Sequence, residues 1–107
     1  MNQQTIQTIA EAIGQLRVLQ YHCFRLAEIG LFTRAELQRL LGAAEVALDW
    51  ARAYGRVFPE QAREGLREAL EYLSRAQTAA QVSPEWPEVA PRFAELRRFC
   101  ESWDPLA

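Results

Sequence analysis

The chain has 107 residues, of which 50% are hydrophobic and 24% are charged. This composition is typical of globular proteins and excludes a wholly disordered chain, and the length predicts one domain spanning residues 1–107. The formal net charge is −2. Proteins dedicated to nucleic acid usually carry a marked basic excess for their phosphate contacts, so the charge balance disfavours that class.

The expected cellular location follows from two kinds of segment that the sequence does not show, a secretory signal peptide and a membrane-spanning helix. Residues 1–8 contain no basic run followed by an apolar stretch, so no secretory signal peptide is expected. No apolar run approaches the roughly 20 residues that a membrane-spanning helix needs, so we expect no membrane association. The 12 basic residues are all Arg, a bias that favours a GC-rich bacterial or phage genome. We accordingly expect a cytoplasmic protein.

Apolar residues recur every three or four positions between residues 4 and 30, which predicts a first helix of about seven turns that ends near Gly30. The stripe contains Ile6, Ile9, Ile13, Leu16, Cys23 and Ala27. Val18, Tyr21 and Phe24 make the second half of this helix apolar on most sides. Such a helix usually has neighbours on more than one face, so we expect it to be central.

The second predicted helix has a clear start signal. Thr33 and Glu36 match the S/T-x-x-E capping box. Phe32 and Leu37 match the hydrophobic staple that fixes the entry angle of the chain. The apolar stripe that follows contains Leu37, Leu40, Leu41, Ala44, Leu48 and Ala51. Gly55 is expected to end the helix.

Two further helices are predicted, with a proline-rich connection between them. The third begins near Pro59, since proline suits the first helical position, and it fades over residues 78–81. Three prolines within residues 82–91 interrupt the helix, and the last helix spans about residues 88–103, with Pro91 in its first turn. Because the connections are short, neighbouring helices should be antiparallel. The predicted fold is all-α, a small up-down antiparallel bundle of about four helices.

No catalytic, cofactor or metal constellation is predicted. His22 is the only histidine, whereas a zinc site would need about four ligands with local pairs. Cys23 and Cys100 occupy core positions late in two antiparallel helices, so they should lie towards opposite ends of the bundle and share neither a disulfide nor a metal. Adjacent helical residues point about 100° apart, so His22 should face outward. We therefore expect no cofactor and no enzymatic activity.

One stretch resembles a helix-turn-helix. Residues 33–42 are similar to the first helix of that motif, with Gly42 at the turn. The resemblance spans residues 33–57 and implies a nucleic-acid-associated regulator. The arginines that would then contact nucleic acid are Arg34, Arg39, Arg52 and Arg56. Glu45 and Asp49 would repel phosphate from the second helix of the motif, so this function is the alternative.

The favoured function rests on one side of the second predicted helix, where side chains typical of protein interfaces recur at helical spacing. These residues are Arg39, Val46, Trp50 and Tyr54. Trp, Tyr and Arg dominate binding hot spots, although the same aromatic rings could instead close the edge of a small core. We expect a non-enzymatic interaction protein, as an accessory subunit, adaptor, regulator or inhibitor, that docks a helix face onto a larger protein. Self-association stays open as a second use of that face.

Overall fold

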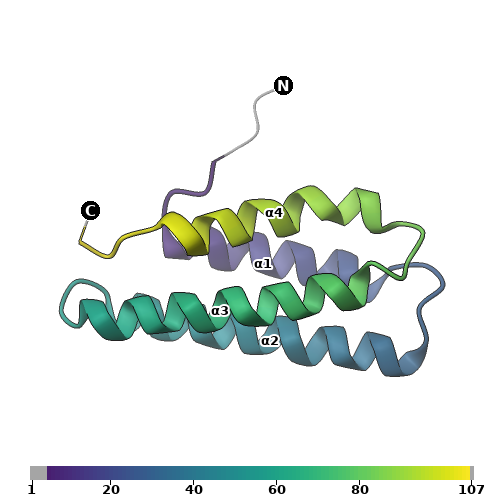
Figure 1. Ribbon diagram of the computed structural model, residues 1–107, viewed down its shortest axis with the longest axis horizontal. Coiled ribbons are helices and arrows are strands. Elements are labelled where there is room, and N and C mark those ends of the chain that lie inside the picture. The colour runs from purple at the N-terminus through teal and green to yellow at the C-terminus, as the bar shows by residue number, and fades with distance from the viewer. Residues whose placement is uncertain (1–4, 107) are drawn as a thin grey trace.

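The computed structural model describes residues 5–106, and these residues form four α-helices and no strands. The helices are α1 (Ile9–Phe24), α2 (Leu31–Tyr54), α3 (Pro59–Ala80) and α4 (Trp86–Ser102). They run up and down in chain order, each antiparallel to the next (Figure 1). α1 packs against α2 and α4, and α3 completes the bundle between α2 and α4. The predicted all-α bundle is confirmed.

The core is made by one apolar stripe from each helix, at the spacings of three and four that the sequence indicates. Its largest fully buried side chains are Phe93, Leu16, Leu19, Leu37, Leu41, Leu48, Leu73 and Leu96. Burying each of these side chains contributes roughly 1.5–3 kcal/mol. The core therefore draws large apolar side chains from all four helices and fixes which face of each helix is left for solvent.

α2 and α3 approach each other closely because small residues line their contact. Gly65 on α3 is buried. A Cβ at Gly65 would lie 2.9 Å from the backbone oxygen of Ala47 and 3.0 Å from the Cβ of Ala51, both on α2. Ala62 and Ala69, about one turn to either side of Gly65, are fully buried. Gly65 therefore sets the spacing of this helix pair.

The two connections at one end of the bundle are joined by hydrogen bonds. Figure 1 shows the α1–α2 and α3–α4 connections at the end opposite the α2–α3 turn. Ser83, which is 3% exposed, donates its hydroxyl to the carbonyl oxygen of Ala27 at 2.8 Å. The carboxylate of Glu85 accepts the N–H of Ala27 at 2.8 Å. α1 consequently ends at Phe24 and not near Gly30, because the intervening residues form this connection.

α1 has two neighbours, as its apolar second half predicts, yet one of its apolar sides faces solvent. Val18, Tyr21 and Phe24 are 40%, 54% and 50% exposed. These three residues recur every third position, so they follow one side of the helix. The expectation of a central helix is therefore only partly met, because a ring of four helices leaves each helix with an outer side.

The start of α2 corrects the predicted cap. α2 begins at Leu31 after an extended Gly30, and no side chain of the described residues caps it. Thr33 lies inside the first turn, and Phe32 is 85% exposed. The predicted capping box and staple are wrong, because a capping residue must have extended backbone and Thr33 is helical. The carboxylate of Glu36 instead accepts a hydrogen bond from Arg39 at 2.8 Å.

The same sequence pattern caps α1. Thr8 is extended, and its Oγ1 accepts the N–H of Glu11 at 3.1 Å. The Glu11 carboxylate reaches back to accept the N–H of Gln7 at 2.7 Å. This start signal was present in the sequence as Thr8-Ile9-Ala10-Glu11, at the head of the apolar stripe, and it places the helix start after residue 8.

α4 begins earlier than predicted. Its first residue is Trp86, so Pro87 lies in the first turn and Pro91 lies in the helix interior, which corrects the placement of Pro91 in the first turn. The N–H of Trp86 donates to the carbonyl of Ser83 at 3.0 Å, and this turn leads directly into the helix. Pro91 has no N–H to donate to the carbonyl oxygen of Pro87, four residues earlier in the helix. Because Pro91 is exposed, water can hydrogen-bond that oxygen instead.

Candidate interaction surface

Four side chains form an apolar strip along α2 and into the α2–α3 turn, and we call it the α2 strip. Its members are Val46, Trp50, Tyr54 and Phe58. Val46, Trp50 and Phe58 are 56%, 58% and 52% exposed, and Tyr54 is half-buried. The ring centroids of Trp50 and Tyr54 are 5.7 Å apart, and those of Tyr54 and Phe58 are 6.0 Å apart. Three of its four members therefore form a run of neighbouring aromatic rings.

The exposure of Trp50 distinguishes it from the other two tryptophans. Trp86 and Trp103 are partly buried and pack against the core, and Trp86 lies 5.5 Å from Phe93 between ring centroids. Those two rings close core edges, which is the alternative role that the sequence left open for the aromatic residues. Trp50 keeps more than half of its surface in solvent. Its ring is thus available for contact.

A shallow hollow of about 520 Å³ lies beside the α2 strip, between α2 and α3. Its lining comprises Ala43, Val46, Ala47, Trp50, Glu68 and Tyr72. Tyr72 is half-buried against the core, and Glu68 is exposed at the edge. The small side chains of Ala43 and Ala47 extend the apolar surface of the strip towards α3, and Glu68 borders that surface with a negative charge.

Arg39 lies on the same side of α2 as the α2 strip, nearer the start of the helix, and its charge is paired with that of Glu36. Its guanidinium contacts the carboxylate of Glu36, and its side chain is 57% exposed. Arg39 and Trp50 are separated by about 16 Å along the helix axis at 1.5 Å per residue. The structure therefore brings Val46, Trp50 and Tyr54 together as predicted, with Arg39 further along the same helix. Phe58 was missed, although it follows Tyr54 by four positions, because the helix ends between them.

The helix-turn-helix geometry is not formed. α2 runs without interruption from Leu31 to Tyr54, so Gly42 lies in the middle of one helix and not at a turn. The residues around Gly42 explain this continuity, since Leu40, Leu41, Ala43 and Ala44 all have high helix propensity. Two helices crossing at a turn, which that motif needs for entering the major groove, are therefore not formed within residues 33–54.

The four arginines of the alternative function are spread along α2 and the turn that follows it. Arg34 donates to the carbonyl oxygen of Phe24, and Arg52 pairs with Asp49 at 2.9 Å, while Arg39 pairs with Glu36. Arg56 is exposed in the α2–α3 turn and has no ion pair within residues 5–106. Arg34 and Arg52 are about 27 Å apart along α2. Two of these four charges are neutralised by carboxylates, and the set spans the full length of the helix.

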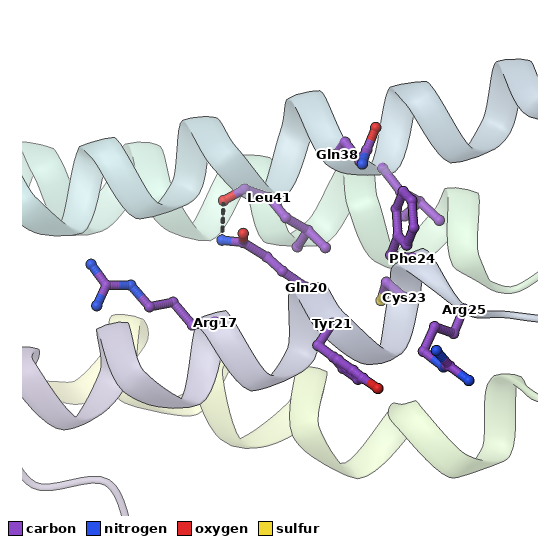
Figure 2. Close-up of a pocket in the computed structure, with 9 residues that line it drawn as sticks. Arg17, Gln20, Tyr21, Cys23, Phe24, Arg25, Gln38 and Leu41 are labelled. Carbon is purple, nitrogen blue, oxygen red and sulfur yellow. Dashed lines mark hydrogen bonds between the residues drawn. The ribbon is translucent and has the colours of Figure 1, made fainter.

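A second surface feature is an open groove between α1 and α2, which we call the α1–α2 groove (Figure 2). It measures about 550 Å³. Its nine lining residues are Arg17, Gln20, Tyr21, Cys23, Phe24, Arg25, Leu37, Gln38 and Leu41. The floor is apolar, because Cys23, Leu37 and Leu41 are each 1% exposed. At one end, Arg17 pairs with Glu45 at 3.1 Å, and Gln20 donates to the same carboxylate at 2.9 Å.

The cysteines and the histidine lie as the sequence indicates. Cys23 and Cys100 are buried free thiols near the ends of α1 and α4, which are antiparallel, and His22 is exposed. Burial raises the pKa of the Cys23 thiol to about 12. Burial, together with the charge of Glu101, raises the pKa of the Cys100 thiol to about 12. Within residues 5–106, no group of three or more His, Cys, Asp or Glu side chains could hold a metal ion.

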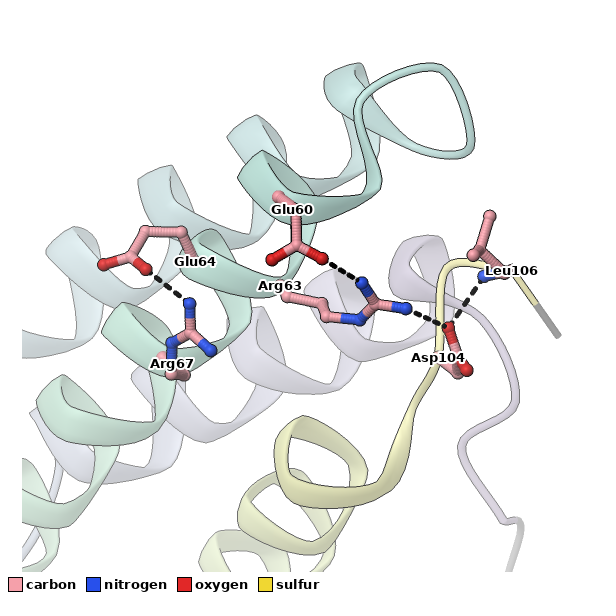
Figure 3. A network of polar contacts seen from close by, with 6 residues as sticks. All are labelled: Glu60, Arg63, Glu64, Arg67, Asp104 and Leu106. Carbon is pink, nitrogen blue, oxygen red and sulfur yellow. Dashed lines mark hydrogen bonds and ion pairs between the residues drawn. The ribbon is translucent and has the colours of Figure 1, made fainter.

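A network of polar contacts ties the segment after α4 to the start of α3 (Figure 3). Arg63 contacts the carboxylate of Glu60 at 2.5 Å and that of Asp104 at 3.2 Å. The N–H of Leu106 donates to the same Asp104 oxygen at 2.9 Å. This N–H and the nearby Arg63 guanidinium lower the pKa of the Asp104 carboxyl. These surface contacts therefore hold the segment after α4 against the first turns of α3.

Comparisons with known proteins found no matching family model, no matching curated protein and no matching solved structure. Among the helices of the described residues, none combines the length and the apolar character that crossing a bilayer demands.

Proposed function

We propose that this protein is a non-enzymatic docking protein of the cytoplasm that binds a larger protein through the α2 strip. In this role it acts as an accessory subunit, an adaptor or an inhibitor, and it regulates its partner without catalysing a reaction. The observation that carries the proposal is the exposure of Val46, Trp50 and Phe58, each more than half accessible, on one rigid helix and its adjoining turn.

The chemistry of the strip supports a protein partner. Trp and Tyr supply large contact areas at low cost in side-chain entropy, and they are the residues most enriched at binding hot spots. The Trp50 and Tyr54 rings are already held 5.7 Å apart, so little ordering is needed on binding. Ala43 and Ala47 beside them leave a hollow that an apolar side chain of a partner fits.

The test is capture of a partner from extract of the source organism with tagged wild type and two separate variants, Trp50→Glu and Val46→Glu. Both positions are exposed, so each variant should fold, as far-UV circular dichroism would verify. The matched control is Val82→Glu, which places the same charge on a 65% exposed valine at the opposite end of the bundle. We expect one protein to be retained at high salt and after nuclease by wild type and Val82→Glu, with at least about 30-fold weaker binding by the two strip variants.

Other outcomes assign the function elsewhere. Equal retention by wild type and both strip variants would remove the α2 strip from the interface. Recovery of the chain itself, with sedimentation showing a dimer that Trp50→Glu dissociates, would assign the strip to self-association. Nucleic acid held only at low salt, and lost after substitution of Arg34, Arg39, Arg52 and Arg56 by alanine, would support the nucleic-acid-associated regulator. That last result would retire protein docking as the primary role.

A further inference from the structure

We propose that the α1–α2 groove is a second docking site, and that its occupant is an acidic amphipathic helix of another protein. The inference does not rest on the α2 strip, because the two surfaces use different sides of α2. Residues Gln38 and Leu41 face the groove, whereas Val46 and Trp50 line the hollow beside α3. Three independent properties of the groove support the proposal, namely its apolar floor, its exposed aromatic walls and its charge.

The floor and walls of the groove fit an apolar helix face. Cys23, Leu37 and Leu41 form a buried floor, and Tyr21 and Phe24 stand beside it with about half of their surfaces exposed. Figure 2 shows the Phe24 ring between the two helices, close to Gln38. From Arg17 to Phe24 the groove follows about 10 Å of α1, the length of two helical turns. That length accommodates anchors at positions i, i+3 or i+4, and i+7 of a docked helix.

The charge of the groove selects an acidic occupant. Of its nine lining residues, all within the described part of the chain, two are arginines and none is acidic. The Arg25 guanidinium lies 5.4 Å from the centroid of the Tyr21 ring, and that of Arg34 lies 5.7 Å from the Phe24 ring. Neither of these two arginines makes an ion pair within residues 5–106. Glu45 pairs with Arg17 at one end, so the positive charge left for an acidic occupant comes from Arg25, with Arg34 beside the Phe24 ring.

A second copy of this chain is a poor occupant. Its acidic side chains on α3, such as Glu60 and Glu64, lie opposite an apolar stripe that the core already buries. Within the described residues, no large apolar side chain of α3 or α4 is exposed. The exposed apolar side of α1 carries Arg25 beside it, which would repel the groove. The α2 strip is bordered by Glu68, so the charge of the groove would not repel that face of a second copy. We assign the complementary helix to a different protein, and a dimer that both Trp50→Glu and Phe24→Ala dissociate in sedimentation would instead assign the groove to a second copy.

The test uses two synthetic helical peptides that share leucine at every third or fourth position and differ only in carrying glutamate or lysine elsewhere. Binding is measured by fluorescence anisotropy at low and high salt, and located by amide chemical shifts of the full-length chain. We expect the glutamate peptide to bind, to weaken as salt rises, and to shift the amides around Tyr21, Phe24 and Gln38. The lysine peptide should not bind measurably.

Single substitutions sharpen the result. Arg25→Gln should raise the Kd of the glutamate peptide about fivefold, and Phe24→Ala about tenfold or more. The matched controls are Arg56→Gln, an exposed arginine in the α2–α3 turn, and Trp50→Glu in the α2 strip, and both should leave the Kd unchanged. Equal binding of the lysine peptide, shifts centred on Trp50, no response to Arg25→Gln, or full displacement by anionic lipid vesicles would each overturn the proposal. Because Trp50→Glu is silent here, failure of this site and failure of the α2 strip are distinguishable.

Discussion

Ser83 and Ala27, 56 positions apart in sequence, are joined by a 2.8 Å hydrogen bond from the Ser83 hydroxyl to the Ala27 carbonyl oxygen. The same hydroxyl accepts the N–H of Glu85 at 3.1 Å. One buried oxygen atom therefore organises the α3–α4 connection and fastens it to the α1–α2 connection.

We expect Ser83→Ala to lower the free energy of unfolding by about 2 kcal/mol, because it leaves the Ala27 carbonyl and the Glu85 N–H without this partner. Urea denaturation measures the change. The control is Ser102→Ala, since Ser102 is exposed and its hydroxyl bonds only the Arg98 carbonyl within its own helix. That variant should stay within about 0.5 kcal/mol of wild type. Equal losses in the two variants would contradict the role assigned to Ser83.

Gly65→Ala should destabilise the fold by about 1–3 kcal/mol, although alanine is the better helix former. The added methyl group would lie 2.9 Å from the backbone oxygen of Ala47, which cannot turn aside as a side chain can. The matched control is Gly42→Ala in the middle of α2, where a Cβ meets nothing within 4 Å. We expect that control to gain about 0.5–1 kcal/mol. Thermal unfolding of both variants should show shifts of opposite sign, and a gain at Gly65 would refute the close approach.

Glu28 has a φ of 58°, the left-handed region that costs an ordinary residue roughly 1–2 kcal/mol. Glu28→Gly should therefore raise the free energy of unfolding by about 0.5 kcal/mol, after the greater entropy of glycine in the unfolded chain is subtracted. Gly55, at φ 50°, offers the reverse experiment, and Gly55→Ala should lose about 1 kcal/mol or more. Denaturant midpoints would report both, and a loss at Glu28 would mean that its side chain supplies more stability than its backbone costs.

Stability should fall with rising pH above about 9, because the thiols of Cys23 and Cys100 have a pKa near 12 in the fold and an ordinary value near 9.0 when unfolded. The unfolded chain then releases protons that the folded chain keeps, and each thiol lowers the free energy of unfolding by up to about 1.4 kcal/mol per pH unit. The stability that the two protonated thiols contribute is fully present below pH 9 and is lost progressively as the pH rises towards 12. Urea unfolding of the double variant Cys23→Ala and Cys100→Ala should show a flatter alkaline slope than wild type, and parallel slopes would argue against buried neutral thiols.

The helical periodicity of the sequence was enough to predict the four helices and their buried faces. Start signals were less decisive, since both Thr8 with Glu11 and Thr33 with Glu36 match the capping pattern. Only Thr8 has the extended backbone that a cap requires, and that depends on how the preceding segment is held. The end of α1 likewise depends on hydrogen bonds to Ser83 and Glu85, which sequence spacing does not reveal.

The α2 strip could be predicted in part, because Val46, Trp50 and Tyr54 lie at helical spacing that needs no tertiary information. Phe58 joins them only because the α2–α3 turn brings it back against Tyr54. The α1–α2 groove could not be predicted, because its width depends on the distance between two helices. Whether either surface binds a partner stays a prediction.

The contact at Gly65 has a consequence for the motions of the bundle. α2 and α3 meet through glycine and alanine backbones, so separating them would break many short contacts at once, whereas α1 lies across a groove from α2. Proteins open in cooperative units whose cost follows the local density of buried contacts. We therefore expect amide hydrogens of the α2–α3 hairpin to exchange with solvent last, and those of α1 to exchange sooner, through openings that leave the hairpin intact.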